Sequence, residues 1–178
     1  MSAICVYCAS GPVDSAYLAL AARTGEAIVA AGHTLVSGGG NVSMMGALAR
    51  GAREAGGRTI GIIPEHLMAK EVADLDADEL IVTDTMRERK RLMDELSDGF
   101  ITLPGGIGTF EELFETWTGA YLGVHDKPIV LLNHEGFYDP LIGWLDDLAA
   151  RGFVADQALG KLKVCATVGD SIAYLTTR

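Results

Sequence analysis

Residues 99–112 read GFITLPGGIGTFEE: a short apolar run, a cluster of glycines and the start of a helical pattern. The run from Gly99 to Leu103 predicts a buried strand, which Pro104-Gly105-Gly106 ends. A helix is predicted from Thr109 to Leu122. A strand that turns through glycines directly into a helix is typical of proteins in which parallel strands alternate with helices.

The same alternation continues on both sides of this stretch. Further strands are predicted at Ala3–Cys8, His33–Ser37, Thr59–Ile63, Leu80–Val82, Pro128–Leu132 and Lys163–Thr167. Helices are predicted between them, the first capped near Ser15 and ended by Gly32, the others at about 43–55, 85–96, 137–150 and 171–175. We therefore expect one α/β domain over residues 1–178, with a mostly parallel sheet and helices on both faces.

Composition excludes several classes of protein. The 178 residues carry 14 Lys and Arg against 24 Asp and Glu, a net charge of −10, which disfavours binding to nucleic acid or to anionic lipid. No apolar run reaches the roughly 18 residues of a membrane span, and no signal peptide is expected. Three cysteines make no even disulfide framework, so a reducing compartment, the cytoplasm, is expected.

Two glycine clusters follow predicted strands. Gly38-Gly39-Gly40 comes after one strand and Gly105-Gly106-Ile107-Gly108 after another. Strand ends of a parallel sheet share one edge, where ligands bind, and bare amides at helix starts bind phosphate. We therefore predict a phosphate nest that includes Gly39, Gly40 and Gly105, against the alternative that these glycines only make turns. Neither cluster fits a dinucleotide fingerprint or a P-loop, which favours a mononucleotide or a sugar phosphate.

Glu112 has two interpretations. Thr109-x-x-Glu112 is a capping box, worth about 1 kcal/mol at a helix start. A phosphate on the same amides would make nearby carboxylates costly, and one glutamate would then need another task. Glu112 lies opposite the apolar stripe of its helix and is expected to face solvent, a cleft or a partner subunit.

The cationic residues of segment 86–91 fall on two different faces of the predicted helix. Lys90 and Arg91 are typical of a solvated face that pairs with Asp94 and Glu95 one turn later. Arg89 instead shares its face with three apolar residues that should be core. A guanidinium on an inward stripe needs an anion, so Arg89 is a candidate functional residue.

No metal site or cofactor is expected. Cys5 and Cys8 match C-x-x-C, but they lie within a predicted strand and point to opposite faces. The four histidines show no ligand spacing, and no H-E-x-x-H is present. The residues left for chemistry are carboxylates and Arg89.

Three segments together resemble one known family. SGGGNVSMMG (37–46), GIIPEHL (61–67) and MRERKRLMDELSDGFITLPGGIGTFEELFE (86–115) are similar to the Lonely Guy (LOG) family, whose hallmark PGGxGTxxE is met by Pro104–Glu112. Members were often mislabelled as lysine decarboxylases. The resemblance, which runs from about Ile4 to Phe153, implies a Rossmann-like fold, a homodimer and no cofactor. It implies a phosphoribohydrolase that cuts cytokinin riboside 5′-monophosphates into free base and ribose 5-phosphate.

The resemblance also implies site residues. The catalytic pair would be Arg89 and Glu112. The nucleotide contacts would be Glu71, Arg89, Lys90, Gly106, Ile107, Gly108, Thr109, Phe110, Glu111, Glu112 and Thr118. The chain departs from the family pattern at 43–46 and at Thr118-Gly119-Ala120-Tyr121, where many members have Thr-Trp-Ala-Gln. Loss of a bulky side chain there is expected to widen or reshape a base pocket.

The expected chemistry is that of a glycosidase. Departure of the base leaves an oxocarbenium-like ribose, which the Glu112 carboxylate stabilises while it activates water or forms a covalent intermediate. Arg89 would orient that carboxylate or assist the leaving base. Two alternatives stay open: a general nucleosidase that acts on AMP, and a nucleotide-binding module without enzymatic activity. A lysine decarboxylase is disfavoured because no lysine has a context typical of a pyridoxal phosphate site.

Overall fold

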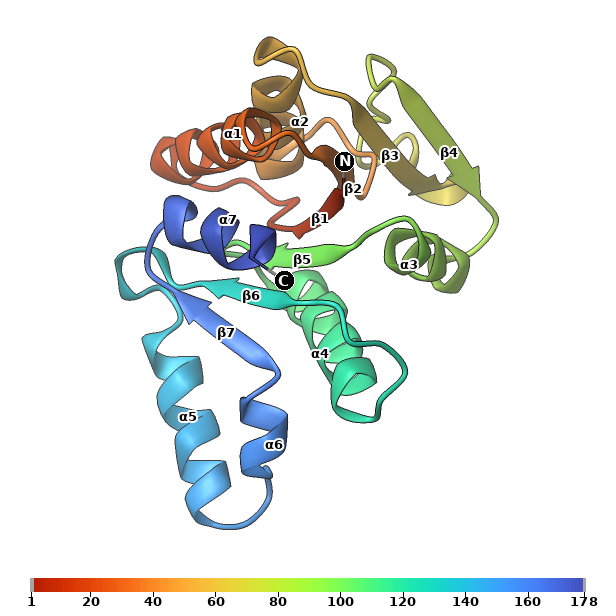
Figure 1. Cartoon of the computed structure of the whole chain (residues 1–178). Coiled ribbons are helices and arrows are strands. Elements are labelled where there is room, and N and C mark those ends of the chain that lie inside the picture. Colours follow the sequence, from red (N-terminus) through yellow and green to blue (C-terminus); the bar gives the residue numbers. More distant parts are fainter. Residues whose placement is uncertain (1, 178) are drawn as a thin grey trace.

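The computed structural model describes residues 2–177 and is built around one seven-stranded sheet (Figure 1). The strand order is β4-β3-β2-β1-β5-β6-β7, and every neighbouring pair is parallel. The strands are β1 (Ala3–Tyr7), β2 (Thr34–Ser37), β3 (Thr59–Pro64), β4 (Glu79–Thr83), β5 (Gly99–Thr102), β6 (Ile129–Leu132) and β7 (Leu162–Cys165). The predicted α/β class with a parallel sheet is confirmed.

Helices connect the strands and cover the sheet. They are α1 (Ser15–Ala30), α2 (Ser43–Glu54), α3 (Met86–Glu95), α4 (Ile107–Tyr121), α5 (Asp139–Ala150), α6 (Asp156–Leu159) and α7 (Val168–Thr176), with short 3₁₀ turns η1 (Glu65–Leu67) and η2 (His134–Gly136). Among residues 2–177, no helix has both the length and the apolar character that crossing a membrane requires.

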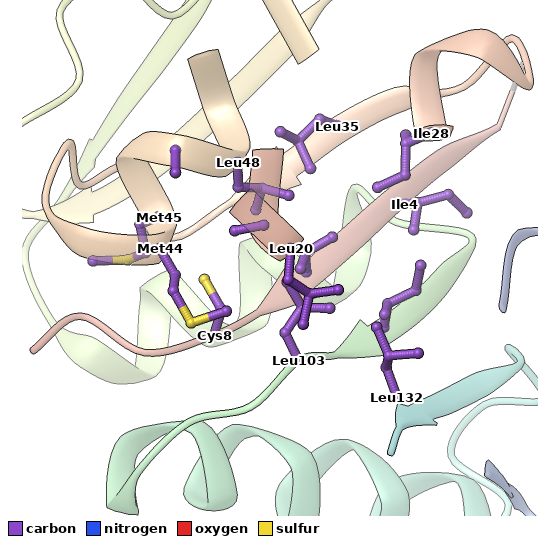
Figure 2. Packing of buried hydrophobic residues seen from close by; sticks show 14 of the residues in the cluster. Ile4, Cys8, Leu20, Ile28, Leu35, Met44, Met45, Leu48, Leu103 and Leu132 are labelled. Carbon is purple, nitrogen blue, oxygen red and sulfur yellow. The ribbon is translucent and has the colours of Figure 1, made fainter. Parts of the chain in front are cut away.

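Successive side chains of each strand point to opposite faces of the sheet, and this produces two separate apolar cores. In β1, Ile4 and Val6 belong to a core shared with α1, α2 and α7, whereas Cys5 and Tyr7 belong to a core shared with α3, α4 and α5. Figure 2 shows part of the first core, with Leu20 of α1 and other apolar side chains packed together. Helices therefore lie on both faces, as expected of a doubly wound sheet, and Cys5 and Cys8 point to opposite sides.

The strand order fixes where a ligand can bind. The chain runs outward from β1 through β2 and β3 to β4, then returns to place β5 against the other side of β1, with Ile4 opposite Gly99. The connections after β1 and after β5 therefore diverge. In open α/β sheets the crevice between such diverging connections, beyond the carboxyl ends of the strands, is the usual ligand site.

The structure differs from the predicted elements in three places, the first of which lies at this crevice. Helix α4 begins at Ile107, and its N-cap is Gly106, which has no side chain to accept a hydrogen bond. Thr109 is therefore the third residue of the helix and not its cap, so the interpretation of Thr109 and Glu112 as a capping box is wrong. The stretch 64–78, expected as a loop, contains the turn η1, and α6 has no counterpart among the predicted elements.

Two glycines let α1 and α2 touch (Figure 1). A Cβ atom on Gly25 would lie 2.2 Å from the backbone oxygen of Leu48, and one on Gly51 would lie 2.2 Å from that of Ala22. Backbone cannot move aside as a flexible side chain can. The small residues of both helices are therefore required for the close packing that covers one face of β1 and β2.

We expect Gly51→Ala to destabilise the protein by about 2 kcal/mol, because the added methyl group overpacks the helix contact. The control is Gly143→Ala in α5, where a Cβ meets nothing within 4 Å and where alanine should add up to about 1 kcal/mol of helix propensity. Urea denaturation of both variants measures the difference. A Gly51→Ala variant as stable as Gly143→Ala would contradict this account of the α1–α2 contact.

Candidate active site

A cavity of about 400 Å³ lies at the crevice between the β1 and β5 connections. Its walls come from the loop after β1, from the start of α4, from α2 and α3, and from the segment after β3. The lining residues are Cys8–Val13, Tyr17, Met44, Met45, Glu71, Met86, Arg89, Pro104, Gly105, Gly106, Gly108, Thr109, Glu111, Glu112 and Phe137.

The N-terminus of α4 forms the anion-binding part of the cavity. Its first amides point out of the helix end, where no side-chain cap satisfies them. Gly106 and Gly108 have open space where a Cβ would stand, so no packing requirement explains them. Gly105 differs, because a Cβ there would lie 2.1 Å from the Thr109 hydroxyl. This end of the helix suits a phosphate group that approaches the backbone closely.

Arg89 is buried in the cavity wall, with 4% of its surface exposed. Helix α3 is fixed in this position by its N-cap, Thr85, whose hydroxyl accepts a hydrogen bond from the Glu88 amide. The Arg89 Nη2 donates to the backbone oxygen of Gly38 over 3.1 Å and lies 3.6 Å from a carboxylate oxygen of Glu71. The buried Nε has no hydrogen-bond partner among residues 2–177. Arg89 thus carries a buried donor that no described residue satisfies.

The triple glycine has a packing role that explains its density. A Cβ on Gly38 would lie 1.9 Å from the Arg89 guanidinium. Gly39 has φ +72°, and a Cβ there would lie 2.9 Å from the Ile62 backbone nitrogen. A Cβ on Gly40 would lie 2.7 Å from the end of the Met45 side chain and 3.1 Å from the Glu71 backbone oxygen. Gly39 and Gly40 are buried and do not line the cavity. The expectation that they form a phosphate nest is therefore replaced: they make room for Arg89 and for the segment that carries Glu71.

Glu71 is held by the backbone on either side of it. The Asn41 amide donates to the oxygens of Glu71, over 3.1 Å, and of Val72, over 2.7 Å. Val72 has φ +50°, a left-handed conformation that is strained for a β-branched residue. One Glu71 carboxylate oxygen is buried and makes no hydrogen bond within the described part of the chain. That oxygen is the one that lies 3.6 Å from the Arg89 Nη2, so the two opposite charges compensate each other in the cavity wall.

Glu112 is the titratable group best matched to catalysis. Burial raises its pKa from 4.5 to about 7, with smaller contributions from the negative charges of Glu111 and Glu71. Arg89 acts in the opposite direction and limits the rise. A carboxyl group with a pKa near neutrality exchanges protons readily at physiological pH, and such shifts gather at active sites.

The other residues that the family resemblance implies as nucleotide contacts lie partly in the cavity and partly at the surface. Gly106, Gly108, Thr109, Glu111 and Glu112 line the cavity, whereas Ile107 is 89% exposed. Phe110 packs against the ring of Tyr138. Thr118 is exposed and lines a different groove, so a single chain does not bring it to this cavity.

Lys90 bridges α3 and α4. Its ammonium group pairs with the carboxylates of Glu111 and Glu115, not with Asp94 as expected, and Asp94 pairs with Lys127 instead. Partial burial alone would lower the pKa of Lys90, but the two carboxylates outweigh it and raise this pKa. Arg91 pairs with Glu95 as predicted.

Sequence reasoning missed the wall that follows β1. Cys8–Val13 and Tyr17 line the cavity, as does Phe137, whose ring meets Tyr17 edge-on at 5.8 Å between centroids. Their importance follows from β5 lying beside β1, and the sequence alone does not reveal strand order. Met44, Met45 and Met86 complete the wall with flexible apolar side chains.

The assembled groups can bind a phosphorylated ligand and act on a bond beside Glu112. Helix amides at one end offer anion binding, and the carboxyl group of raised pKa lies about one and a half helical turns along α4, with Arg89 nearby. Between residues 2 and 177 no group of histidine, cysteine, aspartate and glutamate side chains could hold a metal ion.

Fold and site together define a doubly wound α/β protein with a nucleotide-sized cavity at its topological switch point. Residues 45–175 match the family model described as "Possible lysine decarboxylase", and the chain belongs to this family, the LOG family of the resemblance above. The expectation drawn from the sequence motifs is confirmed.

Several relatives carry a more specific name. A "Cytokinin riboside 5'-monophosphate phosphoribohydrolase" of Mycobacterium tuberculosis is 53% identical over 95% of this chain and 90% of its own length. The rice protein of that name, LOG, is 43% identical over 87% of this chain and 64% of its own. Among solved structures, the molybdenum cofactor carrier protein of Chlamydomonas reinhardtii is 25% identical with a TM-score of 0.72, over 99% of this chain and 96% of its own.

We expect AMP to bind at least about 10-fold more tightly than adenosine, because the phosphate gains charge-assisted hydrogen bonds from the α4 amides. Gly108→Ala should weaken AMP binding by at least about 10-fold, or about 1.4 kcal/mol, since its methyl group occupies the space open to the phosphate. Calorimetry measures both.

Gly143→Ala is the matched control, because it adds the same methyl group to a helix glycine that lines no described cavity. Its AMP affinity should equal that of the unchanged protein. Equal affinities for AMP and adenosine would remove the phosphate site.

Proposed function

We propose that this protein hydrolyses the N-glycosidic bond of cytokinin riboside 5′-monophosphates and releases the free base and ribose 5-phosphate. The names of relatives that share 40–53% of their sequence with this chain support this activity. The single observation that carries it is the Glu112 carboxyl group, with a pKa of about 7, on the same helix as the phosphate-binding amides.

The substrate binds through its phosphate. The 5′-phosphate occupies the α4 N-terminus around Gly106, Gly108 and Thr109, where the helix dipole and the bare amides hold it. Glu112 lies four residues beyond Gly108, about 6 Å along the helix axis. A ribose anchored by its phosphate thus presents its anomeric carbon to this carboxyl group, and the anchor contributes binding energy to that alignment.

Bond cleavage uses Glu112 and Arg89 in different ways. As the bond to the base breaks, positive charge develops on the ribose ring, and ionised Glu112 stabilises it. Water then adds at the anomeric carbon, either with Glu112 as general base or after a covalent intermediate on Glu112. Arg89, which lines the cavity beside Glu112, orients that carboxylate or donates to the departing base.

An AMP nucleosidase and a nucleotide-binding protein without enzymatic activity are the alternatives. The likeness to a molybdenum cofactor carrier protein favours the second, at lower identity than the hydrolase relatives. Incubation with isopentenyladenosine monophosphate and with AMP, followed by chromatography of the base, separates all three. Preferred release of isopentenyladenine supports the proposal, preferred release of adenine supports the nucleosidase, and no release supports the binding protein.

We expect Glu112→Gln to lower turnover by at least about 100-fold, because it removes the negative charge and the titratable oxygen. The fold should survive. Because the pKa of Glu112 is higher in the folded than in the unfolded chain, the free energy of unfolding declines as the pH rises from 4.5 to about 7. Above pH 7 the wild type therefore carries the full penalty of a buried charge. The neutral amide of the variant avoids that penalty, and the melting temperature at pH 8 should not fall.

The pH profile supplies the control for this variant. Wild-type kcat/KM should rise as the pH passes through about 7, because Glu112 must be ionised, and the residual activity of the variant should lack this limb. Full activity in Glu112→Gln would overturn the mechanism. A wild-type profile that falls through pH 7 would instead assign Glu112 as a general acid.

We place the reaction in the cytoplasm. The cysteines at 5, 8 and 165 are free and buried, as in proteins of reducing compartments. Burial raises the pKa of the Cys8 thiol, which keeps it protonated and unreactive although it lines the cavity.

A homodimer completes the proposal. An apolar groove of about 360 Å³ runs between α4 and α5, and Tyr121, Trp144 and Phe153 on its walls are 44%, 54% and 73% exposed. Exposed aromatic side chains gathered on one face are typical of protein interfaces, and a second copy would cover them.

Light scattering at micromolar concentration should give about twice the 18.8 kDa of the chain. Trp144→Glu should lower this mass to that of one chain, because it places a charge in the interface. Since Trp144 is half exposed, the variant should keep its fold, which circular dichroism verifies. A wild-type monomer would overturn the dimer.

A further inference from the structure

A buried ion pair outside the cavity has no part in the mechanism above. Asp74, which is 2% exposed, lies beyond β3 in the same segment as Glu71, and Arg53 lies in the last turn of α2. The Arg53 guanidinium donates to both carboxylate oxygens of Asp74, from Nη1 over 2.7 Å and from Nη2 over 3.2 Å. Neither residue lines a described cavity, so the pair does not contact a ligand bound there.

The segment that this pair fixes contains a strained turn. Val72 has a left-handed conformation, and its side chain is 53% exposed, so burial of that side chain does not hold the turn. Strain of this kind persists only where the surrounding contacts over-determine the backbone. The residue just before the turn is Glu71, which lines the cavity 3.6 Å from Arg89. The contacts that hold Val72 therefore also fix Glu71.

Backbone hydrogen bonds attach this segment to the glycine run after β2. Ala73 forms an antiparallel bridge with Gly40, and the amide of the next residue, Asp74, donates to the Gly39 oxygen over 2.9 Å. The Asn41 amide supplies the bonds to the turn that were described above. Pairing with a glycine-rich stretch specifies register weakly, because few side chains mark the position. The Asp74 carboxylate supplies a side-chain anchor directly beside the turn.

Helix α2 holds both partners of this backbone pairing. Arg50 and Arg53 are three residues apart and so lie on the same side of the helix. Arg50 donates to the side-chain oxygen of Asn41 over 2.9 Å, while Arg53 holds Asp74. Asn41 also packs against Gly46, where a Cβ would lie 2.4 Å from the Asn41 backbone oxygen. The turn is thus fixed to a helix that the core already holds in place.

The position of Glu71 matters because its charge acts on two groups of the site. Its carboxylate compensates Arg89 in the cavity wall. Burial raises the pKa of Glu112 to about 7, Arg89 limits this rise, and the negative charge of Glu71 adds to it. If Glu71 leaves its position, a negative charge is lost near both groups. The pKa of Glu112 then falls, and Arg89 loses one of its two anchors.

The other groups that face Glu112 do not depend on this segment. Lys90 of α3 lowers the pKa of Glu112, and Glu111 of α4 raises it. On β1 and just after it, burial raises the pKa of three further groups and keeps them neutral at physiological pH: Cys5, Tyr7 and Cys8. All of these groups lie on elements other than the one that carries Glu71, so they stay constant when Glu71 moves.

We propose that Arg53 and Asp74 are positioning residues, whose ion pair holds the turn at Val72 and thereby keeps the Glu71 carboxylate against Arg89. Their part in catalysis rests on the proposed function, whereas their effect on the site does not. Well-packed apolar side chains often stabilise a fold as well as a buried ion pair does. What a bidentate pair adds is a fixed direction, and Glu71 requires one.

The test releases the pair from either side and measures the pKa of Glu112 by carboxyl-carbon NMR, with Glu112→Gln to assign the signal. Asp74→Asn removes a negative charge and Arg53→Gln a positive one, so their direct effects on this pKa have opposite signs. Loss of Glu71 from its position predicts instead that both variants lower the pKa. Arg53→Lys keeps the charge and one donor, so its pKa should lie closer to that of the wild type.

Kinetics give a second measurement. Asp74→Asn and Glu71→Gln should each lower kcat/KM by roughly 10-fold at high pH, because Arg89 is then less well placed. The double variant should lose no more than about 2-fold beyond the larger single loss, since one residue acts through the other. Glu79→Gln is the matched control. It removes a carboxylate that pairs with Arg58 at the amino end of β4, away from the cavity, and should change neither the pKa nor kcat/KM.

Opposite shifts of the pKa in Asp74→Asn and Arg53→Gln, an unchanged pKa in both, or losses that multiply in the double variant would overturn the positioning role. If one variant of the pair does not fold, the other is combined with Glu71→Gln, and an equal pKa in the single and double variants is then expected. If the wild type releases no base, the proposed hydrolase function fails. The NMR titration needs no turnover and decides the positioning role separately.

Discussion

The burial of one guanidinium organises this protein more than any other interaction. Arg89 lies inside the cavity wall, bound to the Gly38 oxygen and close to Glu71. Removing one partner of a buried charge costs several kcal/mol, so everything around it must keep its place. The absence of a side chain at Gly38, the strained turn at Val72 and the cap at Thr85 all serve this position.

Arg89 also explains why the pKa of Glu112 lies near neutrality and is not higher. Burial by itself favours the protonated, uncharged carboxyl group and so raises the pKa. The neighbouring guanidinium offsets part of that effect and brings the pKa to about 7. Two opposed influences thus place the pKa of one carboxyl group where the group can ionise near neutral pH.

The sequence predicted the architecture well because strands and helices have different apolar periods. The alternation around Gly99–Glu112 was enough for the α/β class, and the inward stripe of α3 was enough to single out Arg89. The sequence could not reveal that β5 lies beside β1, and so it missed the cavity wall from Cys8 to Val13. It also assigned Gly39 and Gly40 the wrong task, since glycine runs look alike whether they admit a ligand or another part of the chain. Glu71 came only from the family resemblance, because nothing local marks a loop carboxylate that a buried arginine attracts.

The central position of β1 has a consequence for how the molecule is made. This strand is synthesised before both of its neighbours, which are β2, about thirty residues later, and β5, about ninety-five residues later, with Ile4 opposite Gly99. Pairings so distant along the chain form slowly, because a long loop must close before any contact compensates for it. During synthesis one edge of β1 therefore stays unpaired until the second half of the chain is made. The crevice forms only once that half has docked. The cavity is thus a feature that forms late, and a truncated chain that ends before β5 would have the glycines of α1 and α2 in place but would lack the α4 wall of the cavity.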